Sequence, residues 1–305
     1  MKSFRAIGQK VYDIRKGRER RRYYVFLLRC LLNRSRLQKI DKFFQQNELL
    51  SAIAEEYPFV YEQPTRAFFY NKSTFDERAK LVEEHMAFVT ETFRPDVAKE
   101  LYMEKIFPVW ETEIEDKPLC AALFYHPGQR KEGLMTVTLF WGEDKLYQMM
   151  FWIAKNKAGE YSLWIGAMQG PNMEHARDVI KKITKQCHGF RTKNLVLYVT
   201  QAAARVMNIR HIYAVTNYGY YANNHVRVDR KLKTDFSDFW VEAGGKATED
   251  KRFDELPLVE PRKTMEEVPT RKRAVYRKRF AMLDEIDMEV GNNMKKLMGD
   301  TKRNG

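Results

Sequence analysis

Four strand-like segments dominate the middle of this chain and restrict its fold more than any other feature. They are rich in aromatic and β-branched residues and span residues 119–125, 133–141, 146–154 and 161–168. The breaks between them are short and carry Gly, Asn, Asp or Lys, which suits hairpin turns and leaves no room for a crossover helix. The pattern therefore predicts an antiparallel meander at the centre of the fold.

The residues after the meander predict a crossover back to the sheet. Two helical segments are expected, at 173–186 and 194–207, although the first half of the second fits a strand equally well. Residues 209–215 read as a buried strand of the kind that follows a crossover helix in a mixed sheet. The remaining expected elements are short strands at 235–240 and 253–258 and a helix at 265–298.

The N-terminal third is predicted to be helical. Apolar residues recur at three- and four-residue steps through residues 4–54, which is the helical period. Ser73, with Asp76 three residues later, suits the N-cap of a further helix, and the region is expected to end near Pro95. The chain is thus assigned to the α+β class. Its expected parts are a helical basic N-terminal region (1–100), a mixed sheet domain (101–260) and a basic C-terminal helix and tail (261–305).

The positive charge is concentrated at the N-terminus. The formal net charge is +13, and the first 42 residues carry fourteen lysines and arginines against three carboxylates. A protein with such a charge is expected to meet an anionic partner, which includes nucleic acid, a membrane surface and a phosphorylated metabolite. Since the cations share an amphipathic helical segment, the favoured partner is an anionic membrane surface or another envelope component.

The N-terminus does not read as a signal peptide. The apolar stretch at residues 23–32 follows a run of arginines, but Arg29 interrupts it, and Asn33, Arg34 and Arg36 stand where a small-residue cleavage site is required. Ten residues are also too few to cross a bilayer, which needs about 20. The three cysteines form no CxxC pair, as in a reducing compartment. We therefore expect a cytoplasmic protein, peripheral to the inner membrane.

Strong catalytic motifs are absent from the sequence. It contains no GxSxG, GxxxxGK[ST] or HExxH motif and no GxGxxG after a strand, which argues against familiar hydrolases, kinases and dinucleotide-binding enzymes. The six histidines are too dispersed in the sequence to form a ligand pair, so no metal site is predicted.

One candidate anion site lies between the last meander strand and the following strand. Gln169 and Gly170 end the first of these strands, and Arg191, Lys193 and Asn194 precede the second predicted helix. A helix N-terminus with nearby cations binds phosphate well. The simpler alternative is that these residues only cap and solvate the helix.

A polar and aromatic loop follows the strand at 209–215. It contains Asn217, Tyr220 and His225, and loops at strand ends commonly carry function on an α/β sheet. Asn217 is assigned with the anion site, while Tyr220 is a candidate proton donor and His225 a candidate proton acceptor. Alternatively, the rings of this loop simply pack against the sheet. A basic stretch at 262–279 leaves a similar choice between phosphate binding and a solvated helix face.

Two family resemblances follow from these segments. The strand, loop and helix at 161–217 resemble the GNAT acyltransferase superfamily, which implies a GNAT-like sheet and acyl-coenzyme A as cofactor; the loop lacks the paired glycines of that family, and an extra helix intervenes. Four ordered blocks, at 163–172, 193–217, 235–245 and 256–286, resemble the VirK/YbjX family of Gram-negative bacteria. That resemblance implies a role in virulence, envelope stress and resistance to cationic antimicrobial peptides, and it supplies no catalytic residues.

Three functions are compatible with these features. The leading hypothesis is a virulence and envelope-stress accessory protein held on the cytoplasmic face of the inner membrane by its basic N-terminus. The second is a GNAT-like acyltransferase that uses acyl-coenzyme A. The third is nucleic-acid binding, which the charge favours although no known nucleic-acid-binding module is visible. The sequence does not fix an oligomeric state.

Overall fold

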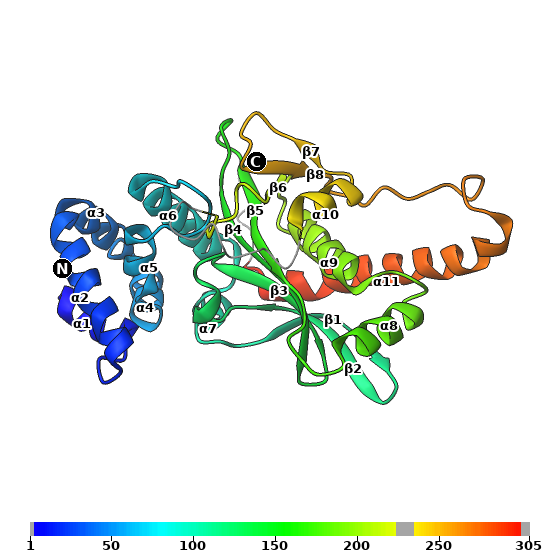
Figure 1. Cartoon of the computed structure of the whole chain (residues 1–305), viewed down its shortest axis with the longest axis horizontal. Helices are drawn as coiled ribbons and strands as arrows, with labels where there is room; N and C mark the ends of the chain where they lie inside the picture. Colours follow the sequence, from blue (N-terminus) through cyan, green and yellow to red (C-terminus); the bar gives the residue numbers. More distant parts are fainter. Residues whose placement is uncertain (1–2, 224–234, 300–305) are drawn as a thin grey trace.

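The computed structural model describes residues 3–223 and 235–299. Helices from the N-terminal third gather at one end of the molecule, and a mixed sheet with the later helices forms the rest (Figure 1). The α+β class predicted from the sequence is confirmed.

The N-terminal region is helical, as the periodicity predicts, and short turns divide it. Its helices are α1 (Phe4–Val11), α2 (Gly17–Leu32), α3 (Arg34–Phe44), α4 (Glu48–Glu56), α5 (Phe59–Glu62), α6 (Phe75–Thr92) and α7 (Pro95–Leu101). The predicted cap of α6 is wrong by one residue. Thr74 and Glu77 form a capping box, whereas the Ser73 hydroxyl donates to the Phe68 carbonyl at 2.9 Å.

The described residues form one sheet of eight strands. They are β1 (Phe107–Ile114), β2 (Lys117–Phe124), β3 (Met135–Trp141), β4 (Asp144–Lys155), β5 (Tyr161–Gln169), β6 (Ile212–Val215), β7 (Lys246–Ala247) and β8 (Phe253–Leu256). Their order is β1-β2-β3-β4-β5-β6-β8-β7. The predicted meander is confirmed as β2 to β5, and β1 extends it by one strand that the sequence reading missed.

The crossover joins β5 to β6, which are parallel. It contains α8 (Ala176–Gln186) and α9 (Thr192–Val206), so the segment whose first half also fitted a strand is helical. Most of α9 is buried, and it packs against β3, β4 and α11 (Arg273–Leu297). The parallel pairing covers only Leu163 to Ile165, while β5 continues to Gln169. β5 therefore extends beyond the end of β6, which stops at Val215.

The strand predicted at 235–240 is wrong, because these residues begin a helix, α10 (Phe236–Glu242). The Asp235 carboxylate accepts a hydrogen bond from the Asp238 backbone N–H at 3.0 Å and caps it. Phe236, Phe239 and Trp240 are buried, and their spacing of three and four residues suits one face of a helix.

Candidate functional site

The two cations of the predicted anion site already have an acidic partner. Glu242, at the end of α10, accepts from Arg191 at 3.3 Å and from Lys193 at 3.0 Å, and these cations lower the pKa of its carboxyl. The Lys193 ammonium also lies 4.5 Å from the centre of the Phe239 ring. The sequence reading missed Glu242, since it lies about fifty residues from either cation and nothing in its surroundings marks it.

The start of α9 still carries unpartnered polar atoms. Within the described residues, the Thr192 hydroxyl and the Asn194 side-chain carbonyl oxygen are buried without a hydrogen-bond partner. The Asn194 backbone N–H bonds to the Arg191 carbonyl at 2.9 Å. Asn194 thus lies at the helix end where it was predicted, but its amide side chain does not cap the helix.

The other predicted anion-site residues lie apart from Arg191 and Lys193. Asn217 binds the opposite end of α10: its side-chain oxygen accepts from the Phe236 backbone at 2.9 Å and its amide donates to Asp235 at 2.7 Å. Seven residues of helix, about 10 Å, separate this end from Glu242. Gln169 is exposed and pairs with Gln148 of β4, and Gly170 lies against the Tyr147 ring.

Tyr220 contacts a carboxyl group that the sequence reading missed. Its hydroxyl donates to Glu132 Oε1 at 3.3 Å, and the Tyr221 ring lies edge-on to the Tyr220 ring at 4.9 Å. The segment at residues 68–71 holds the pair together, because the Phe69 N–H bonds to the Lys131 carbonyl at 2.7 Å and Tyr70 bridges to Tyr220. His225, the predicted proton acceptor, lies outside the described residues.

The pKa values of Glu132 and Tyr220 suit this pair to proton transfer. Burial raises the pKa of the Glu132 carboxyl to about 7, against the Lys131 ammonium and the hydrogen bonds from Tyr220 and Tyr221. Burial and Glu132 both raise the pKa of Tyr220, so its hydroxyl stays protonated. A carboxyl that changes charge near neutral pH beside a fixed proton donor suits general acid–base catalysis.

Glu132 should make stability depend on pH. A carboxyl whose folded-state pKa lies above the unfolded value stabilises the fold at low pH, and that contribution is lost as the pH rises from about 4.5 to about 7. We expect a loss of about 2 kcal/mol, below the full value for this shift because Glu132 is partly exposed. Urea unfolding at several pH values should show this slope, and Glu132→Gln should remove it. If the slope is unchanged in the variant, the pH dependence of stability comes from other groups.

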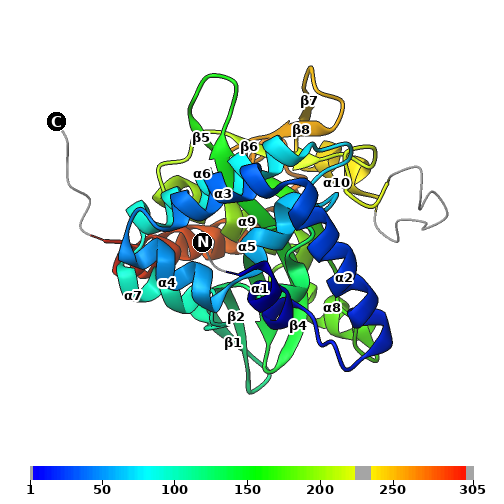
Figure 2. The same ribbon diagram turned by 90° about the vertical axis from the view of Figure 1, so that its left-hand side faces the viewer.

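The outer face of α2 is both apolar and basic. Tyr24, Leu28, Leu31 and Leu32 follow at helical steps, and Leu31 and Leu32 are 67% and 76% exposed. The opposite face, with Tyr23, Phe26 and Cys30, is buried. Figure 2, which looks at the N-terminal end of the molecule, shows α2 along its edge. We call these four exposed residues the α2 apolar stripe.

Arginines flank the α2 apolar stripe at both ends. Arg18 and Arg21 precede it, and Arg34 follows it. In the described part of the chain, no carboxylate lies within 4.0 Å of these three side chains, in contrast to Arg22, which pairs with Glu19. Their charge is therefore available to an external anion.

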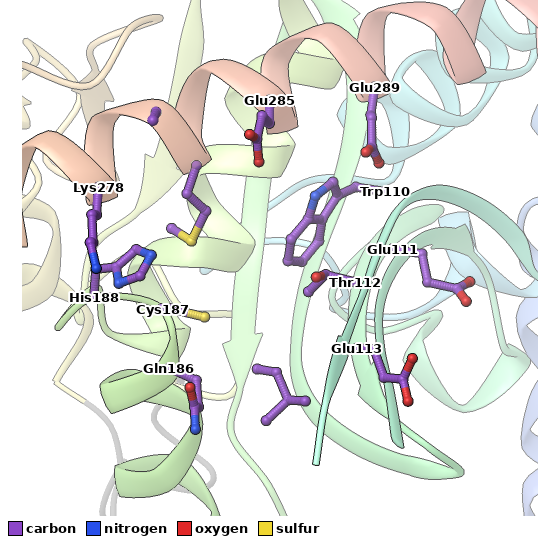
Figure 3. Close-up of a pocket in the computed structure, with 13 residues that line it drawn as sticks. Trp110, Glu111, Thr112, Glu113, Gln186, Cys187, His188, Lys278, Glu285 and Glu289 are labelled. Atoms are coloured by element: carbon purple, nitrogen blue, oxygen red, sulfur yellow. The ribbon is translucent and has the colours of Figure 1, made fainter. Parts of the chain in front are cut away.

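A separate cavity of about 400 Å³ lies between β1 and α11 (Figure 3). Glu285 and Glu289 reach toward it from α11, and Trp110 and Thr112 from β1. Cys187 also lines it, but burial raises the pKa of that thiol to about 11, so it is a poor nucleophile at neutral pH. Of the residues that the sequence suggested for binding, Lys278 of the basic stretch at 262–279 lines this cavity, whereas those of the predicted anion site and Tyr220 do not.

The basic stretch at 262–279 makes internal contacts. Arg262 pairs with Asp284 at 2.6 Å, and Arg279 donates to the His188 carbonyl at 2.9 Å.

Over residues 3–223 and 235–299, no helix has the length and apolar character needed to cross a membrane. In the same ranges, no His, Cys, Asp and Glu side chains gather as a metal site would require.

Comparison with known proteins defines the family of this chain. A family model described as "Protein of unknown function (DUF535)" matches residues 15–292. The chain belongs to this family. One relative, an uncharacterized protein of Haemophilus influenzae, is 27% identical over 92% of this chain and 91% of its own length.

Two further relatives carry names. The uncharacterized protein YbjX of Escherichia coli is 31% identical over 43% of this chain and 40% of that protein. The membrane protein LapB of Mannheimia haemolytica is 22% identical over 68% of this chain and 85% of that protein. The VirK/YbjX resemblance is thereby confirmed at the level of the DUF535 family. No solved structure matches the chain.

Proposed function

We propose that this protein is a peripheral, envelope-related accessory protein that docks on the anionic cytoplasmic face of the inner membrane through α2. The observation that carries the proposal is the α2 apolar stripe, exposed between Arg18 and Arg21 on one side and Arg34 on the other. A helix with exposed leucines beside arginines lies in a bilayer interface with its apolar face among the acyl chains. The printed name of LapB, a membrane protein, agrees with this role.

The expected energies are sufficient for reversible docking. Each arginine near an anionic surface contributes about 1 kcal/mol, and each leucine that is partly buried in the interface contributes about 1 kcal/mol. Three arginines and three leucines therefore supply several kcal/mol. The arginine contribution should fall with added salt, whereas the leucine contribution should not.

Vesicle sedimentation tests the proposal. The wild-type chain should pellet with vesicles of equal parts phosphatidylcholine and phosphatidylglycerol, and much less with phosphatidylcholine alone. The triple variant Leu28→Ser, Leu31→Ser, Leu32→Ser should bind the anionic vesicles at least tenfold more weakly. The matched control replaces exposed apolar residues elsewhere, Met103→Ser, Val241→Ser and Met288→Ser, and should bind like wild type.

Two results would contradict membrane docking through α2. One is equal binding to neutral and anionic vesicles, and the other is equal loss in the control variant. Circular dichroism and urea unfolding of both variants establish that a loss of binding is not a loss of folding.

Enzymatic acyl transfer is a second candidate function, favoured by the Glu132–Tyr220 pair, which lies next to Gly166 of β5. The described residues fit the diphosphate of acyl-coenzyme A poorly, since Glu242 pairs with both Arg191 and Lys193 and offsets one of their two charges, and α8 stands where that site needs a glycine-rich loop. Titration calorimetry should show no heat with acetyl-coenzyme A; a heat that Arg191→Ala abolishes would restore this alternative.

A further inference from the structure

An aromatic cavity of about 550 Å³ lies on one face of the sheet, and neither Glu132 nor Tyr220 lines it. Trp164 of β5, Tyr213 of β6 and Glu255 of β8 are register neighbours across the three strands, so their side chains stand on the same face. Segments at 156–160 and 247–250 border the cavity. We call this hollow the aromatic cavity.

The rings of the aromatic cavity are held in place by their neighbours on the sheet. Trp164 and Tyr213 are stacked with their centres 4.4 Å apart, and Phe253 lies edge-on to Trp164 at 4.9 Å. The Trp164 indole N–H donates to the Ala154 carbonyl at 3.0 Å. The Trp152 ring, from the paired position on β4, lies parallel to the Trp164 ring with the ring centres 6.4 Å apart. The aromatic wall is therefore preformed.

Carboxylates surround this wall and are incompletely neutralised. Glu160 and Glu255 lie on either side of His211, at 3.3 and 2.7 Å. Among the residues that the structure describes, neither carboxylate has a lysine or arginine within 4.0 Å. Two further acidic residues at the cavity do form ion pairs with a lysine or an arginine: Glu249 pairs with Lys157, and Asp250 pairs with Arg252.

We propose that the aromatic cavity binds a small organic cation, of the quaternary ammonium or alkylguanidinium class. Electron-rich ring faces attract such cations, most strongly where water is partly excluded, and Glu160 and Glu255 supply the complementary charge. The apolar wall accepts the alkyl groups that a hydrated metal ion lacks. Phosphate and nucleic acid are disfavoured here, because the carboxylates repel them.

This inference goes beyond membrane docking and is independent of it. The aromatic cavity involves β5, β6 and β8, whereas docking involves α2. Variants of the aromatic cavity should therefore sediment with vesicles like the wild-type chain, so that one proposal can fail while the other stands.

A pair of probes of equal shape tests the inference by calorimetry. Choline should bind measurably, and the neutral alcohol in which a carbon atom replaces the choline nitrogen should bind at least tenfold more weakly. Tyr213→Leu and Glu255→Gln should each weaken choline binding at least fivefold. The control variants Tyr276→Leu and Glu266→Gln lie outside the cavity and should bind like wild type.

The neutral probe distinguishes a cation site from a purely apolar hollow. Equal binding of choline and its neutral analogue would mean that charge plays no part in recognition, and it would overturn the proposal. The absence of heat with both choline and ethylguanidinium, in a chain that unfolds cooperatively, would also overturn it. Quenching of tryptophan fluorescence by choline that disappears in Trp164→Phe would place the bound cation at this wall.

Discussion

Replacement of Glu62 by alanine should destabilise the fold by about 3 to 5 kcal/mol, the usual cost of removing one partner of a buried ionic cluster. Glu62 is fully buried. Its carboxylate accepts from Arg130 at 2.7 Å, from Arg66 at 3.2 Å and from the Tyr12 hydroxyl. Without it, two guanidinium groups would face each other in a partly buried space.

The Glu62 cluster also joins the N-terminal helices to the sheet, because Tyr12 follows α1 and Arg130 lies between β2 and β3. Urea unfolding should therefore show the N-terminal helices detaching early in Glu62→Ala. Glu62→Gln keeps an accepting oxygen and should lose less. The control Glu249→Ala removes an exposed pair with Lys157 and should leave the midpoint unchanged. An unchanged midpoint in Glu62→Ala would show that the cluster does not hold this junction.

Replacement of Gly166 by alanine should cost about 3 kcal/mol through overpacking. Gly166 is the extra residue of a β-bulge, since Met150 pairs with Ala167 and Phe151 with Ile165. A β-carbon there would lie 1.9 Å from the Glu132 carbonyl oxygen and 2.7 Å from the Trp152 ring. The backbone must therefore shift to make room for the added methyl group, and Glu132 shifts with it.

A matched glycine provides the control for Gly166. Gly291 lies within α11 with open space around its missing β-carbon, so Gly291→Ala should stabilise the protein by about 0.5 to 1 kcal/mol. Thermal and urea unfolding of the two variants should shift in opposite directions. A stable Gly166→Ala would be inconsistent with the close approach of β5 to Glu132.

Local patterns explain which elements the sequence predicted. The strands β2 to β5 were predicted because each is a short run of aromatic and β-branched residues between turns. The strand β1 escaped detection because Pro108, Glu111 and Glu113 interrupt its apolar pattern. The segment of α10 was mistaken for a strand because its aromatic residues outweighed the Asp235 cap.

The site was less predictable, because it depends on contacts between distant residues. Tyr220 was predicted as a functional residue, but Glu132 lies 88 positions away and no motif links the two. The pairing of Glu242 with Arg191 and Lys193 is equally non-local. The basic N-terminus was predicted from composition, whereas the exposure of Leu28, Leu31 and Leu32 required the packing of α2 to be known.

The strand order of the sheet determines which strands a second molecule could pair with. Its outermost strands are β1 and β7. The strand β7 has only two residues, while β1 carries Glu111 and Glu113 and is crossed by α11, where the Asn293 amide donates to the Val109 carbonyl at 3.1 Å. A very short outermost strand at one edge, and charged side chains with a crossing helix at the other, both disfavour pairing with the edge of a second molecule. If copies gather densely on a membrane, as proposed, they should therefore stay separate and not polymerise edge to edge.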